Sequence, residues 1–239
     1  MPEPAVHSLL RIATPQALSW EDAGFEAGAA PEWADSALQR LPFVVMRRNL
    51  PRAGQVPVGI RGRLRSQRAP AWLALSAVQG CVTPRMLAAQ RGWRQREHEH
   101  EHEHEHGHGH GYGQRNGHRN EQRRVRGAAS CRAIAVLDQV EAILAAHGFA
   151  ESWGPGGSVG AELASGVQCT HAASDLDLVL YADCLPPRCA AESLHAQLET
   201  LPVRVDALIE TPQGGVVLAD VAGGADRLLL RTALGPRLV

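Results

Sequence analysis

Apolar residues recur with two different spacings along this chain, and the two spacings predict a mixture of strands and helices. In the first third, short apolar runs bounded by turn residues predict three strands, over residues 42–48, 56–62 and 71–75. Pro57 favours an edge position for the second of these strands. The Thr83-Pro84 pair then predicts the start of a helix, since threonine caps helices and proline suits their first position.

The last third of the chain predicts a second and larger set of elements. Apolar residues from Ile134 to Leu144 recur at helical spacing, and the His147-Gly148 pair closes this helix as a C-cap. Two strands, over residues 175–180 and 203–208, flank a helix over residues 190–201. The strand–helix–strand order predicts an α+β fold.

Residues 93–126 separate the two sets and differ from both in composition. Glu and His alternate from Glu97 to His106, and the following histidines alternate with glycine. Such low-complexity sequence cannot bury a core, so we predict a linker at 93–126 between an N-terminal α+β domain at 1–92 and a larger domain at 127–239. Histidine tracts also bind Zn²⁺ or Ni²⁺, which leaves a metal-binding role open.

Charge and composition exclude several classes of protein. The 24 basic and 25 acidic residues give a net charge of −1, which argues against non-specific binding to nucleic acid. No apolar run is long enough to span a membrane, and the first residues lack a secretory pattern, so we expect a cytoplasmic protein without a membrane partner. The five scattered cysteines contain no Cys-x-x-Cys pair, which is typical of reduced thiols rather than of a zinc site.

Three aspartates suggest a metal site in the larger domain. Asp175 and Asp177 stand at i and i+2 of a predicted strand, so their side chains leave the same face about 6–7 Å apart. Asp206 stands in the next apolar strand. Carboxylates in this arrangement can hold two Mg²⁺ ions beside substrate phosphates, which indicates phosphoryl or nucleotidyl transfer. A pair of aspartates on a solvent-facing strand is the alternative.

A glycine-rich turn precedes these aspartates. Gly157 and Ser158 are followed by residues that can begin a helix, and amides at a helix N-terminus attract phosphate oxygens. The turn lacks the Gly-Lys-Ser/Thr ending of a Walker loop and the spacing of a dinucleotide fingerprint. By itself it predicts only a turn, whereas upstream of the aspartates it predicts a cradle for a triphosphate.

The order of these motifs resembles a known superfamily. Gly-Ser, then Asp-x-Asp, then a further Asp on the next strand is similar to the nucleotidyltransferase superfamily that includes DNA polymerase β. A fuller set of motifs resembles a narrower family, the malonate decarboxylase holo-[acyl-carrier-protein] synthases, or phosphoribosyl-dephospho-CoA transferases; the matching runs are residues 153–164, 170–180, 204–206 and 228–238. The N-terminal half matches more loosely, through residues 58–62 and the Gln67-Arg68 pair.

The resemblance implies a fold and a reaction. It implies a polymerase-β-like catalytic domain at 127–239, with the N-terminal domain available to bind the substrate or the carrier. A serine of the acyl-carrier subunit of malonate decarboxylase would attack the α-phosphate of triphosphoribosyl-dephospho-CoA, and pyrophosphate would leave. The carrier would keep the phosphoribosyl-dephospho-CoA arm.

The resemblance also implies roles for individual residues. Asp175 and Asp177 would hold two Mg²⁺ ions, and Asp206 would share one of them and help to deprotonate the serine. Gly157 and Ser158 would bind the leaving pyrophosphate, and Arg61 and Arg68 would bind substrate phosphates. His7 receives no catalytic role, because the family pattern has an aspartate after this histidine and Ser8 stands there instead.

Two other functions remain open from the sequence. An ATP-dependent small-molecule nucleotidyltransferase would use the same aspartates and the same Gly-Ser turn. A non-enzymatic, His-rich metal-binding protein would rely on the Glu/His tract alone. The N-terminal domain and the close of the chain at 228–238 favour the carrier-modifying family over both.

Overall fold

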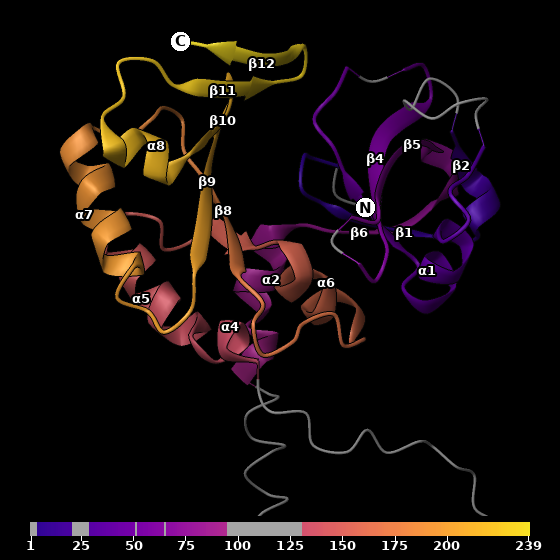
Figure 1. The fold of residues 1–239 in the computed structure, drawn as a ribbon, viewed down its shortest axis with the longest axis horizontal. Helices are drawn as coiled ribbons and strands as arrows, with labels where there is room; N and C mark the ends of the chain where they lie inside the picture. Colours follow the sequence, from indigo (N-terminus) through magenta and orange to yellow (C-terminus); the bar gives the residue numbers. More distant parts are fainter. Residues whose placement is uncertain (1–3, 21–28, 51, 65, 95–130) are drawn as a thin grey trace, which may run out of the picture.

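The computed structural model describes residues 4–20, 29–50, 52–64, 66–94 and 131–239. Within these residues the strands form two six-stranded sheets, one from each half of the chain, with helices packed around them (Figure 1). The α+β class predicted from the sequence is therefore confirmed. Most of the predicted linker, including the Glu/His tract, lies outside the described residues. No helix within the described ranges is long and apolar enough to cross a membrane.

The N-terminal sheet is antiparallel and is built from short strands. In the order β2-β5-β4-β3-β1-β6, its strands are β2 (Leu18–Ser19), β5 (Arg68–Ala74), β4 (Gln55–Arg61), β3 (Phe43–Met46), β1 (Leu9–Ile12) and β6 (Val78–Val82). Helix α1 (Ala34–Arg40) and two 3₁₀ turns (Pro15–Ala17 and Leu75–Ala77) complete this half. Leu10, Val44 and Leu73 are fully buried in its core.

The edge position expected from Pro57 is wrong, because β4 lies between β5 and β3. Pairing between β3 and β4 stops at Met46 and Val58, so Pro57 stands just past the end of β3. There its carbonyl accepts a hydrogen bond from the Arg47 amide at 2.9 Å. Pro57 therefore lies where β4 extends beyond the last residue pair that it forms with β3.

The C-terminal sheet supplies the framework for the predicted aspartates. In the order β12-β11-β10-β9-β8-β7, its strands are β12 (Gly235–Leu238), β11 (Leu229–Thr232), β10 (Gly214–Val217), β9 (Val205–Thr211), β8 (Leu176–Tyr181) and β7 (Trp153–Pro155). The β8–β9 pair is parallel and the other pairs are antiparallel. The helices of this half are α4 (Arg132–Ala135), α5 (Leu137–Ala146), α6 (Gly157–Ser165), α7 (Arg188–Leu198) and α8 (Leu218–Gly223).

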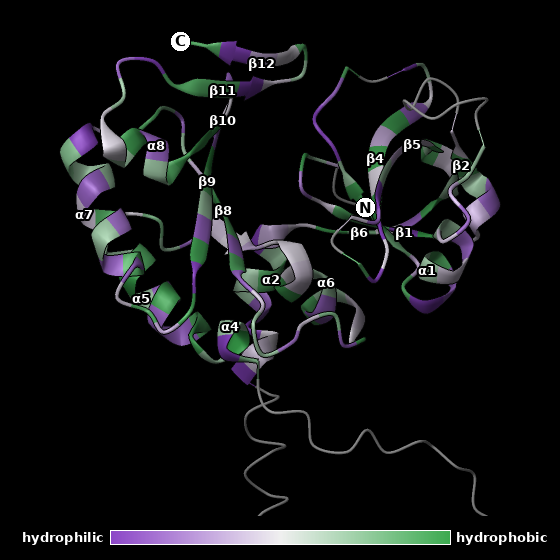
Figure 2. Ribbon diagram, in the orientation of Figure 1, coloured by the Kyte–Doolittle hydropathy of each residue, from purple (hydrophilic) through white to green (hydrophobic). Residues whose placement is uncertain are grey.

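One face of this sheet is apolar and carries the core. Leu176, Leu178 and Leu180 of β8 are buried in one cluster with Leu144 of α5 and Leu194 of α7. Figure 2 shows why the helices pack there, since α5 and α7 alternate hydrophobic and hydrophilic positions around their axes. The predicted helix from Ile134 onward is split at Val136 into α4 and α5, and it ends at the predicted His147-Gly148 cap.

Helix α2 (Pro84–Gln90) joins the two halves. Thr83 caps it as predicted, because its hydroxyl accepts a hydrogen bond from the Met86 amide at 3.1 Å. The helix packs on β7 and α6. Just beyond it, Trp93 is 1% exposed and lies in the C-terminal core, with its ring 6.1 Å from that of Trp153. Trp93 is the first position of the predicted linker.

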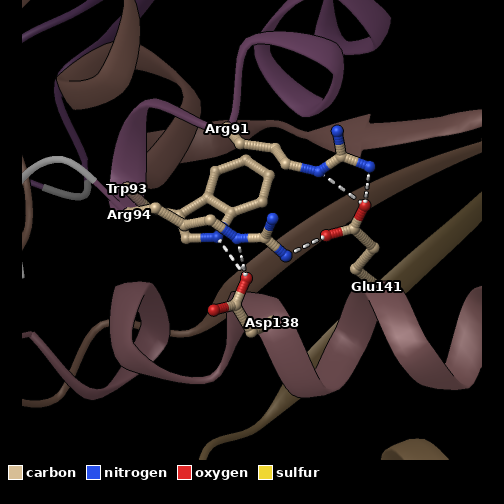
Figure 3. Close-up of polar contacts among 5 residues, drawn as sticks. All are labelled: Arg91, Trp93, Arg94, Asp138 and Glu141. Atoms are coloured by element: carbon tan, nitrogen blue, oxygen red, sulfur yellow. Dashed lines mark hydrogen bonds and ion pairs between the residues drawn. The ribbon is translucent and has the colours of Figure 1, made fainter.

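Ionic contacts tie this segment to α5 (Figure 3). The Trp93 indole N–H donates to Asp138 at 2.9 Å, and Arg94 donates to Asp138 at 2.7 Å and to Glu141 at 2.9 Å. Arg91 also donates to Glu141, at 2.8 Å from its Nε. The hydrogen bond from Trp93, with further help from Arg94, holds the pKa of Asp138 below its usual value. Residues 91–94 are thus fixed on the C-terminal half.

Candidate active site

The face of the C-terminal sheet opposite the core carries the predicted aspartates. In the parallel pair β8–β9, Asp177 stands beside Asp206 and Tyr181 stands beside Glu210. Alternation along each strand therefore places Asp177 and Asp206 on one face, with Tyr181 and Glu210 further along it. Asp175 lies just before β8, and its charge acts on the carboxyl of Asp177. The structure brings the second and third predicted aspartates into direct register on neighbouring strands.

Asp177 is the most strongly perturbed of the three aspartates. Burial raises its pKa, and the nearby negative charges of Asp206 and Asp175 raise it further, while Arg61 and Arg68 act in the opposite direction; the net result is a raised pKa. Asp206 is more exposed and accepts hydrogen bonds from the Arg204 guanidinium at 3.1 and 3.2 Å. Asp177 is therefore a half-buried carboxylate in need of positive charge, which is typical of functional sites.

The Gly-Ser turn packs directly against Asp177. The Gly156 amide donates to the Asp177 carbonyl at 2.9 Å, and helix α6 begins at the next residue. Gly157 has a φ of +54°, and a Cβ atom at this position would stand 1.7 Å from Oδ2 of Asp177. Only glycine fits this turn without moving the carboxylate. Ser158 follows at the second position of α6, so the first amides of the helix lie next to the aspartates.

The two predicted arginines reach the same place from the other sheet. Arg61 ends β4 and Arg68 begins β5, and the two residues are directly paired across this hairpin. Both lie close enough to Asp177 for their charges to lower its pKa. The structure thus gathers Arg61, Arg68, the aspartates and the Gly-Ser turn between the two sheets.

The described residues contain no group of three or more His, Cys, Asp or Glu side chains placed to hold a metal ion by themselves. Of the predicted metal ligands, Asp177 and Asp206 share a face and Asp175 lies just before β8, but the three do not form such a cluster. A magnesium site here therefore stays a prediction. The donor set is nevertheless chemically suitable, because all three groups are hard carboxylate oxygens and Asp177 is destabilised by its carboxylate neighbours.

Comparisons with known proteins give the family. The model of the phosphoribosyl-dephospho-CoA transferase MdcG C-terminal domain matches residues 121–239, and that of the MdcG N-terminal domain matches residues 5–84. The chain belongs to the phosphoribosyl-dephospho-CoA transferase family. It is therefore a transferase, as the sequence predicted.

Curated relatives match over nearly the full length. Phosphoribosyl-dephospho-CoA transferase from Pseudomonas putida strain W619 is 35% identical over 100% of this chain and 95% of its own. The enzyme of the same name from Pseudomonas fluorescens Pf-5 is 37% identical over 98% and 90% of the two chains, and that from Klebsiella pneumoniae strain 342 is 32% identical over 94% and 93%. No solved structure matches the chain significantly.

A buried glutamate holds the segment of the chain that precedes the aspartates. Glu162 of α6 accepts hydrogen bonds from the amides of Cys169 and Thr170 at 3.0 and 2.9 Å, and from the Thr170 hydroxyl at 2.7 Å. It thereby fixes the segment that leads to Asp175. In the turn that follows, His171 accepts a hydrogen bond from the Ala173 amide at 3.2 Å, and its own amide donates to Ser174. The imidazole of His171 thus already has a structural role in this turn.

Sequence reasoning missed the contacts at the far end of the polar face. Glu210 binds His7 and Arg48 of the N-terminal half, and the Arg85 guanidinium stacks 4.2 Å above the Tyr181 ring. Burial raises the pKa of Tyr181 to about 12, although Arg85 acts against this rise. Asp206 and Glu210 are four residues apart in one strand, and this even number predicts that both side chains lie on the same face of the sheet. Nothing in the sequence indicated which N-terminal residues would meet it.

Proposed function

We propose that this chain transfers the phosphoribosyl-dephospho-CoA group from its triphosphate precursor to a serine of the apo acyl-carrier subunit of malonate decarboxylase, with release of pyrophosphate. We further propose that the C-terminal half is a polymerase-β-like nucleotidyltransferase domain. The observation that carries the proposal is the register of Asp177 beside Asp206, with Gly157 against one carboxylate and two arginines facing it. Family membership favours this reaction over an ATP-dependent transferase or a His-rich metal-binding protein.

We propose Mg²⁺ as the cofactor of this site, because its candidate ligands are carboxylates. Asp175, Asp177 and Asp206 would hold two Mg²⁺ ions, with substrate phosphate oxygens as further ligands. Bound magnesium would neutralise charge on the attacking and leaving oxygens. The pKa of Asp177 is raised first by burial and then by the charges of Asp206 and Asp175, and a bound cation would offset both effects, which supports this assignment.

The chain's own side chains would perform the remaining tasks. Arg61 and Arg68 would bind the phosphates through guanidinium hydrogen bonds, which suit tetrahedral phosphate oxygens. The amides at the start of α6 and the Ser158 hydroxyl would bind the departing pyrophosphate. The carrier serine Oγ would form a bond to the α-phosphorus as the bond to pyrophosphate breaks, and Asp206 would accept the serine proton.

The proposal also names a compartment and partners. All five cysteines are free thiols, which suits a reducing cytoplasm. The partners would be the acyl-carrier subunit and triphosphoribosyl-dephospho-CoA. We propose no nucleic-acid partner, since the net charge is close to zero.

Carrier modification followed by mass spectrometry tests the proposed function. The purified chain, Mg²⁺ and the triphosphate precursor should add one phosphoribosyl-dephospho-CoA mass to the apo carrier and release one pyrophosphate. A carrier whose acceptor serine is changed to alanine is the control and should gain no mass. Absence of modification of the intact carrier, or transfer from ATP alone at a similar rate, would contradict the proposal.

Ser158→Ala should weaken transfer by about 10–100-fold, because the amides of the same turn would still hold the pyrophosphate. Ser165→Ala is the matched control, since Ser165 stands at the other end of α6 and its hydroxyl donates to the Ala161 carbonyl at 2.6 Å. Steady-state rates of carrier modification compare the two variants. Full activity in Ser158→Ala would remove this serine from the site, and a complete loss would assign it more than one hydrogen bond.

A further inference from the structure

Glu210 is a buried carboxylate that the transfer chemistry does not use. It is 9% exposed and lies four residues after Asp206 on the same face of β9, about 13 Å further along the strand. Its Oε1 atom lies 2.8 Å from His7 Nε2 and also accepts a hydrogen bond from the Arg48 guanidinium. Burial raises the pKa of Glu210, but the hydrogen bonds from His7 and Arg48 outweigh burial and hold it below its usual value.

The backbone of His7 is held in an uncommon conformation that delivers its ring to Glu210. Its φ is +73°, in the left-handed region that residues other than glycine seldom adopt. Hydrogen bonds fix this turn to the end of β3, since the His7 amide donates to the Met46 carbonyl at 3.0 Å and the Met46 amide donates to the Ser8 carbonyl at 2.8 Å. Strained residues persist where their surroundings determine them and where function uses them.

Strand β10, next to β9, leaves space for the contact between Arg48 and Glu210. Gly215 of β10 is paired with Glu210 across the sheet. A Cβ atom on Gly215 would stand 2.6 Å from Oε1 of Glu210 and 3.0 Å from Nη2 of Arg48. The absence of a side chain at Gly215 therefore lets the arginine reach the carboxylate.

The two halves of the protein thus touch this face at two separated places. Arg48 lies beside the start of β4, because the neighbouring Arg47 amide donates to the Pro57 carbonyl, whereas Arg61 is the last residue of β4. From Pro57 to Arg61 the strand rises by about 13 Å, which matches the rise from Glu210 to Asp206 on β9. One end of the N-terminal sheet is held at Glu210, and the other end presents Arg61 and Arg68 to Asp177.

We propose that Glu210 is a positioning residue: by holding His7 and Arg48 it fixes the N-terminal sheet against β9 and so keeps Arg61 and Arg68 facing Asp177. What the arginines bind rests on the proposed function, whereas the positioning itself does not. His7, to which the sequence analysis gave no catalytic role, belongs to this tie through its contact with Glu210.

A binding experiment tests whether Glu210 acts through the two arginines. Titration calorimetry measures the Kd of inorganic triphosphate with Mg²⁺ for the full chain, for Glu210→Gln, for an Arg61→Ala/Arg68→Ala variant and for the combination of all three changes. Glu210→Gln should raise Kd by about 10–100-fold in the normal chain, because small displacements of binding groups are costly, and by less than about twofold once both arginines are gone. Glu199→Gln, an exposed glutamate at the end of α7, is the matched control and should leave Kd unchanged.

Hydrogen exchange gives a readout that does not depend on a substrate. Glu210→Gln should speed amide exchange at Arg61 and Gly62, at the far end of β4 from the substitution, while exchange in β11 and β12 stays unchanged. His7→Asn, which tolerates a positive φ, should act in the same direction and serves if Glu210→Gln does not fold.

The possible outcomes distinguish the positioning role of Glu210 from the proposed transfer function. Equal weakening of triphosphate binding in both backgrounds, or unchanged exchange at Arg61 and Gly62, would overturn the positioning role. Failure of the normal chain to bind triphosphate would instead count against the proposed function, and the exchange measurement would then decide the role of Glu210 on its own.

Discussion

Asp177→Ala should lower the rate of carrier modification by about 10³-fold or more while the protein stays folded. This carboxylate stands beside Asp206 on the next strand and packs against the Gly-Ser turn. It also interacts electrostatically with Arg61 and Arg68. Its loss removes a ligand for the proposed metal ions and breaks the arrangement that binds the triphosphate. Asp175→Ala should have a similar effect, because Asp175 lies just before β8 and its charge acts on the Asp177 carboxyl.

Stability gives an independent check on the same substitution. Burial raises the pKa of Asp177 in the folded protein, so ionisation of this carboxyl lowers stability as the pH rises through the raised pKa. Without Mg²⁺, Asp177→Ala or Asp177→Asn should therefore melt at the same temperature as the unchanged chain or higher. Asp183→Ala, an exposed aspartate just after β8, is the control for activity and should remain active. Retained transfer in both Asp175→Ala and Asp177→Ala would remove the metal-site assignment.

Gly157→Ala should reduce transfer by about 10²-fold, the second largest effect that we expect. The added methyl group would occupy the place of the Asp177 carboxylate, with only 1.7 Å between Cβ and Oδ2. Asp177 would have to rotate away, which moves a carboxylate out of the site without unfolding the sheet. A positive φ adds a smaller cost to the free energy of folding, of about 1 kcal/mol.

Gly166→Ala separates these two effects. Gly166 ends the same helix with a φ of +71°, and a Cβ atom there would meet nothing within 4 Å. This variant should show a small loss of stability and nearly full transfer activity. Melting curves and carrier-modification rates for both variants form the comparison. If the two alanine variants lose activity equally, backbone strain in α6 rather than the displacement of Asp177 explains the loss.

The sequence predicted the parts of the site that depend on local spacing. The Gly-Ser turn before a helix and the Thr83 cap each follow from neighbours a few residues apart, and both appear as expected. The predicted strand that carries Asp177 also forms, but it begins at Leu176, so Asp175 lies just before it. The family resemblance supplied Arg61 and Arg68, which the antiparallel β4–β5 hairpin then pairs.

What the sequence could not supply depends on how two separate sheets face each other. The contact between His7 and Glu210 joins residues 203 positions apart, and no local pattern encodes it. The edge position predicted from Pro57 was wrong for a related reason. From sequence alone, an edge strand cannot be distinguished from an interior strand that extends beyond a shorter neighbour. The position of Trp93 depends on the core of the C-terminal half, which no residue near Trp93 in the sequence defines.

The attachment of Trp93 and Arg94 has a consequence for how the chain tolerates change in length. Arg94 is hydrogen-bonded to Asp138 of α5. Cys131 begins the next described segment; it is 9% exposed, lies in the same core, and its thiol donates a hydrogen bond to the His171 carbonyl. Arg94 and Cys131, the described residues on either side of the stretch 95–130, are therefore both anchored on the C-terminal half. Loop-closure entropy grows only with the logarithm of length, by about 0.6 kcal/mol for each doubling. A change in the number of residues between Arg94 and Cys131 should therefore cost little stability.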